Sequence, residues 1–350
     1  MDDVIVQHGA LRSLVRDTLT ATGSNADEAK IVSDQLVDAN LTGHDSHGAG
    51  LLPMYMRDRK AGNVHPNLHA KLLREDGPIG VFAGGLGYGQ VLGKEVTEWG
   101  IAKAQKSGSA ILALRDSYHV GRVGSYGVQV YEAGLVGIFF VNVVFGSPRV
   151  APYGGSDGRL HTNPICIAVP GGKDHLPVLL DFATSKVAVG KVRVAYNAKK
   201  KLPPDTLIDA KGQPTTDPAV LYEEPLGAVL PFGEHKGSGL AVMCELLAGV
   251  LTGGTTNHDS GLGNRGLINN MFAIIVDPAR FTETGLFHSQ IAEVLHHVTA
   301  SPPASPEHPV MVAGEPERRT QAARLASGIP VDPTTWREIQ DTARSVGALK

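Results

Sequence analysis

The loop His44-Asp45-Ser46-His47 places two imidazoles, a carboxylate and a hydroxyl within four residues. Histidine exchanges a proton near neutral pH, and a neighbouring hydroxyl or carboxylate can fix which ring nitrogen carries that proton. The loop therefore fits acid–base chemistry. Two other interpretations fit the same residues. The loop could cap a helix, or His44 and His47 could be metal ligands, although no obvious third ligand accompanies them.

A second candidate segment is Ser117-Tyr118-His119-Val120-Gly121-Arg122, which follows an expected strand and leads into an expected helix. Strand ends are where α/β proteins tend to place reactive groups. The glycine permits close backbone approach, and the free N–H groups at a helix start can hold an anion. The same residues also fit an ordinary strand–helix turn that happens to contain His119.

Two further segments suit a phosphate or a ribose. Lys236, in His235-Lys236-Gly237, begins an apolar helix, where a positive charge is unfavourable unless an anion compensates it. A pyrophosphate would do so, and so would a surface salt bridge. Asp181, in Asp181-Phe182-Ala183-Thr184-Ser185, ends an expected strand. Its carboxylate could orient a histidine, bind a ribose hydroxyl or cap the next element.

The segment Gly261-Leu262-Gly263-Asn264-Arg265-Gly266 matches the dinucleotide fingerprint G-x-G-x-x-G. It follows the polar stretch 255–260 rather than a strand, and no acidic residue lies at the expected distance on a second strand. We therefore interpret it as a surface loop that lies away from any nicotinamide.

The elements that position these residues alternate between strand and helix, which indicates an α/β core. The valine-rich run 136–144 predicts a buried strand, and Ser24 with Asp27 predicts a capping box for a helix that ends near Gly43. Other strands are expected over 79–83, 110–114, 178–180 and 271–276. Other helices are expected over 11–23, 55–60, 90–106, 125–133 and 332–346, and a buried helix is expected over 239–251. The proline-rich segment 301–309 predicts an exposed connection.

Composition narrows the classes of protein. The chain has 350 residues, 42% hydrophobic and 19% charged, which suits about two domains with a sizeable core. The formal net charge of -3 argues against nucleic acid or an anionic membrane as the main partner. Cys166 and Cys244 lie in apolar stretches and are expected to be buried thiols. No secretory signal is visible, and the most apolar stretch is too short to cross a bilayer, so we expect a cytoplasmic protein.

Taken together, these segments resemble the malate/L-lactate dehydrogenase type 2 family, and most closely its hydroxycarboxylate dehydrogenase B branch. The order and spacing of several motifs along nearly the whole chain carry this resemblance. They are Asp45-Ser46-His47-Gly48, His119-Val120-Gly121-Arg122, Thr162-Asn163-Pro164, Asp181-Phe182-Ala183-Thr184-Ser185, His235-Lys236-Gly237 and Gly314-Glu315.

The resemblance implies hydride transfer between NADH or NADPH and a 2-oxo acid or a cyclic imine acid, in a homodimer or larger assembly. It implies catalytic roles for His47 with Ser46 and Asp181, and for His119, which other members use as the acid–base group. It implies a substrate contact for Tyr55. The implied cofactor contacts are Gly121, Arg122, Val123, Asp181, Phe182, Ala183, His235, Lys236, Gly314 and Glu315. No metal is implied.

One position departs from the family pattern. Many members place an arginine five residues after the motif serine, where this chain has Leu51. Another cation must therefore bind the substrate carboxylate, and Arg122, Arg149 and Arg193 are candidates, of which we select Arg149. An apolar residue at this position also leaves room for a larger or less polar substrate side chain.

We therefore expect an α/β fold in which a non-Rossmann, mixed-sheet nicotinamide-binding core covers 76–285. A helical domain is expected from both chain ends, 1–75 and 286–350, with the active site between the two domains. The expected function is interconversion of 2-oxo and 2-hydroxy acids with a histidine acid–base, His47 being the preferred proton donor. A cyclic imine reductase is the alternative, and a metal-dependent hydrolase built on His44, Asp45 and His47 is a weaker one.

Overall fold

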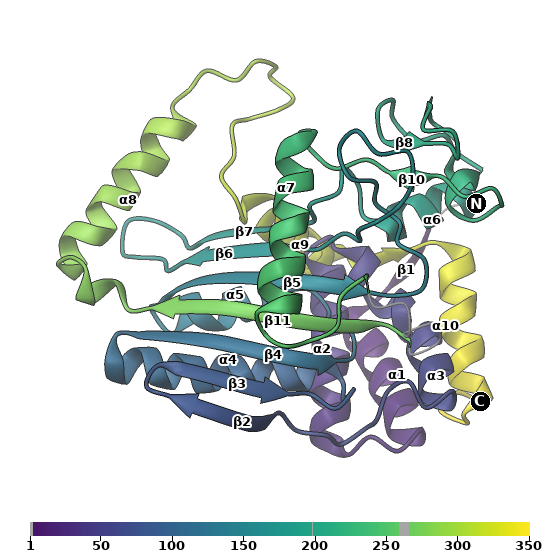
Figure 1. Cartoon of the computed structure of the whole chain (residues 1–350), viewed down its shortest axis with the longest axis horizontal. Coiled ribbons are helices and arrows are strands. Elements are labelled where there is room, and N and C mark those ends of the chain that lie inside the picture. The colour runs from purple at the N-terminus through teal and green to yellow at the C-terminus, as the bar shows by residue number, and fades with distance from the viewer. Residues whose placement is uncertain (1–2, 198, 259–265) are drawn as a thin grey trace.

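The computed structural model describes residues 3–197, 199–258 and 266–350, and its centre is a seven-stranded sheet (Figure 1). The strand order is β2-β3-β4-β11-β5-β6-β7. Only β3 and β4 are parallel neighbours, and all other neighbours are antiparallel. The sheet is therefore mixed, as expected. Its strands are β2 (Lys71–Asp76), β3 (Ile79–Ala83), β4 (Ser109–Ser117), β5 (Val136–Val144), β6 (Ile165–Val169), β7 (Val178–Phe182) and β11 (Ile268–Val276).

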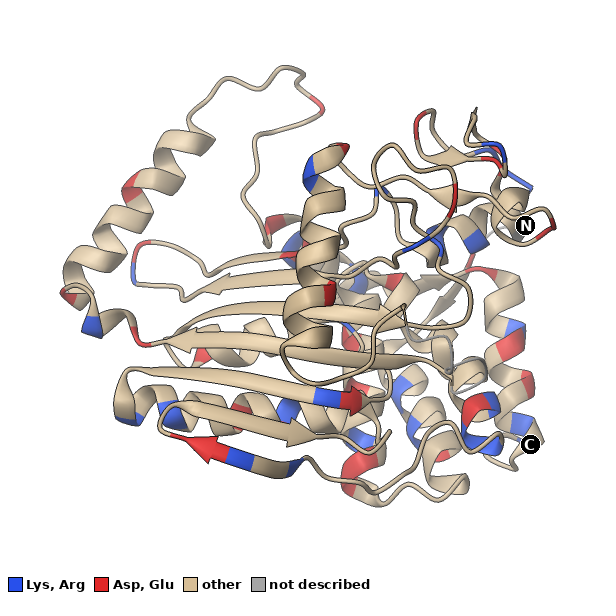
Figure 2. Cartoon of the chain, in the orientation of Figure 1, with Lys and Arg blue, Asp and Glu red and all other residues tan. Residues whose placement is uncertain are grey.

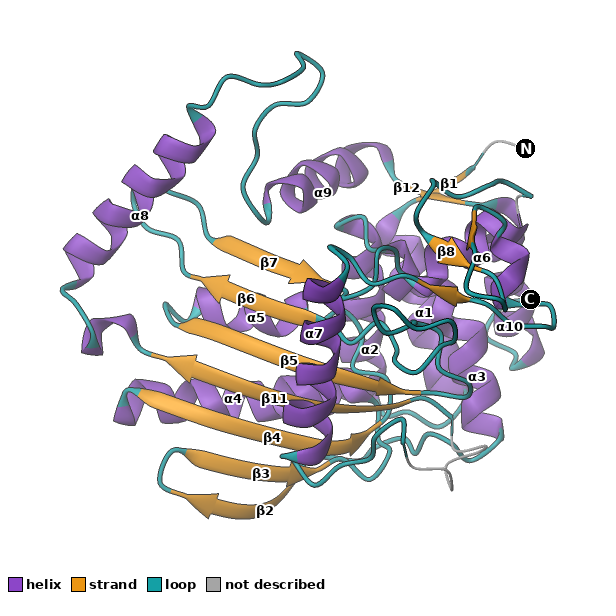
Figure 3. Ribbon diagram, turned by 45° about the horizontal axis from the view of Figure 1, so that its top comes forward, coloured by secondary structure: helices purple, strands orange, loops and turns teal. Residues whose placement is uncertain are grey.

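Helices cover both faces of this sheet. The helices α4 (Gly89–Ser107) and α5 (Gly124–Glu132) lie on one face, while α7 (His235–Cys244) crosses the other (Figure 3). Side chains of β4, β5 and β11 form the main core together with those of α4 and α5. The continuous apolar strand β5 is thus covered on both sides, which explains why its sequence does not alternate.

The two chain ends build one layer beside the sheet. Strand β1 (Val4–Val6) pairs with β12 (Ile329–Val331), and α10 (Pro333–Ser345) packs against α1 (His8–Ala21) and α3 (Leu52–Lys60). Side chains from both ends share one hydrophobic cluster, which confirms that the terminal helices pack together. The helices α1 (His8–Ala21), α2 (Ala26–Leu41) and α3 (Leu52–Lys60) complete this layer.

The remaining elements lie at the edges. A small sheet of β8 (Leu207–Ile208), β9 (Pro214–Thr215) and β10 (Ala228–Val229), which the sequence did not predict, lies near α6 (Val189–Asn197). The helix α8 (Thr284–Thr299) extends away from the body, and a long loop returns from it to α9 (Glu315–Ser327) (Figure 1). The expected exposed connection 301–309 is part of this loop.

Two local predictions were wrong. The cap of α2 is Asn25, whose side chain accepts a hydrogen bond from the Glu28 N–H at 2.8 Å, whereas the Ser24 hydroxyl bonds the Glu28 carboxylate instead. The segment 239–251 is not a fully buried helix. It starts earlier, at His235, passes into a π-helix over Glu245–Val250, and leaves an apolar outer face exposed. Apolar composition alone cannot distinguish a covered helix face from an uncovered one.

Within the described ranges, no helix combines the length and apolar character that a membrane crossing requires. Cys166 and Cys244 are free and buried, as expected.

Candidate active site

The turn that carries His47 is a short 3-10 helix, η1 (Asp45–His47), held from both sides. The Asn40 side chain donates to the Asp45 carboxylate at 2.6 Å and accepts from the Ala49 N–H at 2.8 Å. A Cβ at Gly48 would meet that same Asn40 amide at 2.3 Å, so only glycine fits there. Because these contacts fix the turn, its histidine has a defined position.

Arg324 of α9 closes the other side of the turn. Its guanidinium binds both Asp45 carboxylate oxygens, at 2.7 and 3.0 Å. The Asp45 carboxylate therefore already binds an arginine and an amide, so it is not available as a metal ligand beside His44 and His47. In the described part of the chain, no three potential metal-ligating side chains form a cluster.

His119 reaches the same place from the sheet, just after β4. The backbone N–H of Val120 donates to the buried Asn269 side chain at 2.9 Å, which anchors the segment to β11. The His119 ring stacks on the His47 ring with centroids 5.5 Å apart and planes inclined by 20°. The tertiary structure thus brings together the two histidines that the sequence singled out.

Each ring has its Nδ1 beside a hydroxyl. Ser46 Oγ lies 3.0 Å from His47 Nδ1, and the Tyr55 hydroxyl lies 2.7 Å from His119 Nδ1. Tyr55 is fully buried and contacts the site through His119. The structure therefore places Tyr55 behind a histidine rather than on a cavity wall.

Both rings are neutral near pH 7. Burial lowers the pKa of His47 to about 4, although the negative charge of Asp181 acts in the opposite direction. Burial lowers the pKa of His119 to about 3, and the neighbouring His47 adds to this effect. Only His47 has a carboxylate near enough to stabilise its imidazolium, because no carboxylate contributes to the pKa of His119.

The two histidines line a cavity that we call the arginine cavity. Arg149 and Arg193 lie on its wall, and neither forms an ion pair with an acidic side chain in the described ranges. Arg149 donates one hydrogen bond to the Leu221 carbonyl, which orients it. Much of the remaining wall is apolar and includes Leu51, Met54, Val143, Phe145 and Leu267. The cavity can therefore hold an anion that carries an apolar group.

Ser46 and His47 also line a second hollow, which we call the Asp181 groove. The predicted residues Arg122, Val123, Asp181, Phe182 and Ala183 line it together. It also contains residues that the sequence analysis did not select, among them Lys186, Phe232 and Glu317. His47 thus stands between an arginine-lined cavity and a groove that brings a carboxylate and a guanidinium together.

Asp181 and Arg122 form a buried pair in this groove. Asp181 Oδ2 lies 3.4 Å from Arg122 Nε and accepts the Gly124 N–H, at the start of α5, at 2.9 Å. The helix start that was expected to hold a ligand anion is therefore occupied by the protein's own carboxylate. Neither His47 nor Asp181 hydrogen-bonds the other, so Asp181 acts on His47 through its charge.

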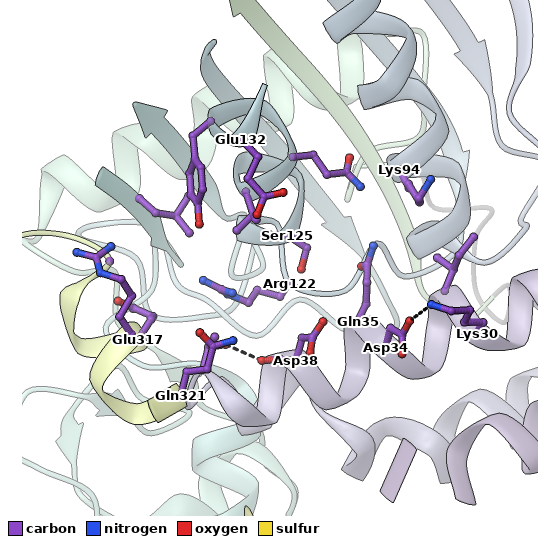
Figure 4. A pocket seen from close by; sticks show the side chains of 18 residues that line it. Lys30, Asp34, Gln35, Asp38, Lys94, Arg122, Ser125, Glu132, Glu317 and Gln321 are labelled. Atoms are coloured by element: carbon purple, nitrogen blue, oxygen red, sulfur yellow. Dashed lines mark hydrogen bonds and ion pairs between the residues drawn. The ribbon is translucent and has the colours of Figure 1, made fainter. Parts of the chain in front are cut away.

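Arg122 also lines a third hollow between α2, α5 and α9 (Figure 4). There it lies between Ser125 of α5, Asp38 of α2, and Glu317 and Gln321 of α9. Gly314 lines this hollow as well. Arg122 is not among the residues that line the arginine cavity, so Arg149 and Arg193 are the cations on its wall.

Other predicted positions lie further out. His235 and Lys236 are the exposed first residues of α7. The centroid of the His235 ring lies 6.0 Å from that of the Tyr153 ring. Glu315 pairs with Arg319 at 2.5 Å. Gly121 lines the arginine cavity with φ +71°, a backbone conformation that favours glycine. The fingerprint-like segment 261–266 falls outside the described residues except for Gly266.

Sequence reasoning missed two buried residues at the site. His161 lines the arginine cavity, and burial lowers its pKa to about 4. Its Nε2 has no hydrogen-bond partner among the residues that the structure describes. Gln90 donates from Nε2 to the Tyr55 hydroxyl at 2.6 Å. His161 precedes the recognised Thr162-Asn163-Pro164 motif, which was the available signal for it, whereas no local signal marks Gln90 inside a helix.

Comparisons with known proteins agree with this geometry. The family model described as malate/L-lactate dehydrogenase matches residues 6–340. Hydroxycarboxylate dehydrogenase B from Escherichia coli (strain K12) is 43% identical over 339 residues, covering 96% of this chain and 93% of that protein. L-lactate dehydrogenase from Cupriavidus necator is 37% identical and covers 96% of both chains. A solved E. coli structure of a candidate malate/lactate dehydrogenase superposes with a TM-score of 0.93 at 42% identity, covering 98% of this chain and 96% of that one. This chain belongs to the malate/L-lactate dehydrogenase family.

Proposed function

We propose that this protein interconverts 2-oxo acids and 2-hydroxy acids, with NADH or NADPH as the hydride donor. One observation carries the proposal. Two neutral histidines stand beside a cavity with two arginines that have no carboxylate partner among the described residues. One of the histidines, His47, also lines a groove that contains Asp181 and Arg122. The names of the similar proteins, a hydroxycarboxylate and a lactate dehydrogenase, support the same reaction class.

The Asp181 groove suits a nicotinamide cofactor. Phe182, Ala183 and Val123 offer apolar contacts for a ring, while Arg122 and Lys186 offer positive charge for phosphates. A bound nicotinamide supplies the hydride. We propose a non-Rossmann mode of binding, because a sheet with one parallel pair of neighbours lacks the crevice between parallel strands that dinucleotides use in doubly wound folds.

The arginine cavity suits the acid substrate. Arg149, oriented by the Leu221 carbonyl, and Arg193 can form charge-assisted hydrogen bonds with the carboxylate. Leu51, Met54 and Leu267 can contact an apolar substrate side chain. The carboxylate would then fix the 2-oxo carbon beside the histidines, which is the positioning that hydride transfer requires.

His47 is proposed as the group that carries the proton. Its neutral form can accept the proton of a 2-hydroxyl in the oxidative direction and return it to the carbonyl oxygen during reduction. The charge of Asp181 stabilises the imidazolium that forms in between. Ser46, 3.0 Å from Nδ1, holds the ring so that Nε2 is left for the substrate.

We propose that the terminal layer and the sheet core are two domains, with the active site between them.

We also propose that the protein assembles as a homodimer. Apolar side chains are exposed along the outer face of α7 and its π-helical extension, with Val250 60% and Leu251 62% exposed. Figure 2 shows few charged residues on α7 and α8. A contiguous exposed apolar face of this kind is typical of a protein–protein interface. Light scattering after gel filtration measures the mass, and a monomer would contradict the dimer.

The function is tested by following NADH and NADPH consumption with a panel of acids: pyruvate, phenylpyruvate, oxaloacetate, 2-oxoglutarate and a cyclic imine carboxylate. We expect turnover of one or more 2-oxo acids, and Arg149→Met should lower it by about 10–100-fold at low substrate concentration. Turnover of the cyclic imine alone would favour the imine reductase. Failure of both cofactors to bind, measured by NADH fluorescence, would contradict the proposed function.

A further inference from the structure

A buried chain of three side chains ends at His119. Gln90 Nε2 donates to the Tyr55 hydroxyl oxygen at 2.6 Å, and the Tyr55 hydroxyl lies 2.7 Å from His119 Nδ1. Gln90 and Tyr55 are fully buried, and His119 is 8% exposed. Water therefore does not compete for these hydrogen bonds.

The donors and acceptors of this chain fix its direction. An amide nitrogen only donates, so the Tyr55 oxygen accepts from Gln90. The single Tyr55 proton is then left for His119 Nδ1, which must accept it. In a neutral imidazole one nitrogen is protonated and the other is not. Nε2 of His119 therefore carries the hydrogen.

The same chain cannot pass a proton to His119. Burial raises the pKa of Tyr55 far above its usual value, so a tyrosinate is not accessible, and Gln90 has no proton to exchange. Among the described residues, no carboxylate contributes to the charge environment of His119. If the ring became an imidazolium, Nδ1 would become a donor facing the Tyr55 hydroxyl, whose own hydrogen would lose its partner.

His47 has the complementary arrangement. For its Nε2 to act as a base, Nδ1 must hold the hydrogen and donate to Ser46 Oγ, 3.0 Å away. The two stacked rings then present different atoms to the arginine cavity, a lone pair on His47 and an N–H on His119. A 2-hydroxyl needs both: it donates its proton to one ring and accepts a hydrogen bond from the other.

We infer that His119 remains neutral throughout the reaction and donates a hydrogen bond from Nε2–H to the C2 oxygen of the substrate, while His47 alone carries the proton. Tyr55 and Gln90 are positioning residues that hold His119 in this tautomer. The inference rests on the proposed function for its catalytic meaning. A preorganised donor of this kind stabilises the charge that develops on the oxygen as the hydride arrives.

The tautomer is measurable without any assay of activity. In protein labelled with ¹⁵N at histidine, two-bond ¹⁵N–¹H correlation spectra distinguish a protonated Nε2 from a protonated Nδ1. We expect His119 to show a protonated Nε2 and an unprotonated Nδ1 throughout the neutral pH range. A protonated Nδ1 would mean that Gln90 accepts from Tyr55, and this result would overturn the inference. An inactive wild type with the expected spectrum would instead contradict the proposed function alone.

Two variants test the positioning role. Tyr55→Phe removes the donor to Nδ1, so both tautomers should appear and kcat should fall, towards the roughly 10²–10³-fold loss known for a missing donor to an oxyanion. Gln90→Glu keeps the side-chain shape but its carboxylate accepts from Tyr55, which should reverse the chain, protonate Nδ1 and raise the pKa of His119.

Tyr88→Phe is the matched control, because Tyr88 is a fully buried neighbour of Tyr55, 5.8 Å away between ring centroids. Its hydroxyl has no hydrogen-bond partner in the part of the chain that the structure describes. We expect this variant to retain the wild-type tautomer and kcat. An equal loss of kcat in Tyr55→Phe and Tyr88→Phe, with unchanged His119 spectra, would reduce Tyr55 to a packing role. The Gln90→Glu spectrum decides the question if Tyr55→Phe does not fold.

Discussion

His47 and His119 are stacked with their ring centroids 5.5 Å apart, although one belongs to a turn after α2 and the other follows β4. Their surroundings differ in one respect that matters for chemistry. Asp181 contributes its negative charge to His47, whereas His119 has the uncharged Tyr55 as its partner. Two adjacent imidazoles therefore suit two different roles.

The first prediction distinguishes these roles by kinetics. His47→Gln should lower kcat for 2-oxo acid reduction by about 10²-fold or more, because the general acid is lost. His119→Gln should raise the substrate KM at least as much as it lowers kcat, because the glutamine amide can still donate. NADH fluorescence should show that both variants bind cofactor. If His47→Gln keeps its kcat while His119→Gln loses both kcat and pH dependence, the roles are reversed.

The second prediction concerns stability in acid. His47 and His161 have pKa values of about 4 and His119 of about 3, below the usual 6.5, because burial penalises the imidazolium. Below pH 6.5 the unfolded chain therefore binds more protons than the folded protein. The contribution of these histidines to the free energy of unfolding should be fully present above that pH. It should decrease as the pH falls towards 4, by at most about 1.4 kcal/mol per pH unit for each histidine.

Urea unfolding at several pH values across this window measures the slope. His161→Asn should reduce the number of protons taken up on unfolding, and with it the slope, by about one proton, since one of the three buried rings is removed. An identical slope in this variant would show that His161 binds its proton at the same pH in the folded protein as in the unfolded chain.

The third prediction concerns the start of α7. Lys236 is exposed there, where a cation is unfavourable next to the helix dipole unless an anion binds. Lys236→Ala should raise the KM for NADH or NADPH much more than it changes kcat at saturating cofactor, because binding common to the ground and transition states is lost. Lys211→Ala, at another exposed lysine, is the control. An unchanged cofactor KM would make Lys236 a surface charge only.

The fourth prediction ranks the two arginines of the arginine cavity. Arg149 is oriented by the Leu221 carbonyl, so it should bind the substrate carboxylate more strongly than Arg193 does. Arg149→Met should raise the KM for the 2-oxo acid by about 10–100-fold, the usual range for a lost hydrogen bond to a charged group. Arg193→Met should have a smaller effect. The opposite order would make Arg193 the main carboxylate ligand.

Several features of this protein followed from local sequence. The strands 79–83 and 136–144 have the bounds that hydrophobic patterning predicted. Ser46, His47, His119 and Asp181 were recognisable because their motifs combine reactive groups with glycines and strand ends. The Asn25 cap was missed in favour of Ser24, since both types cap helices and only backbone geometry selects between them.

Other features depended on the tertiary structure. Whether 239–251 is buried depends on what covers its outer face, and no pattern within the helix records that. Among Arg122, Arg149 and Arg193, only three-dimensional packing separates Arg122, paired with Asp181, from the two that share a cavity with the histidines. Gln90 and Tyr55 are distant from His119 in sequence and meet it only in the fold. The protonation of a histidine depends on which buried partner contacts each nitrogen, and folding alone brings those partners together.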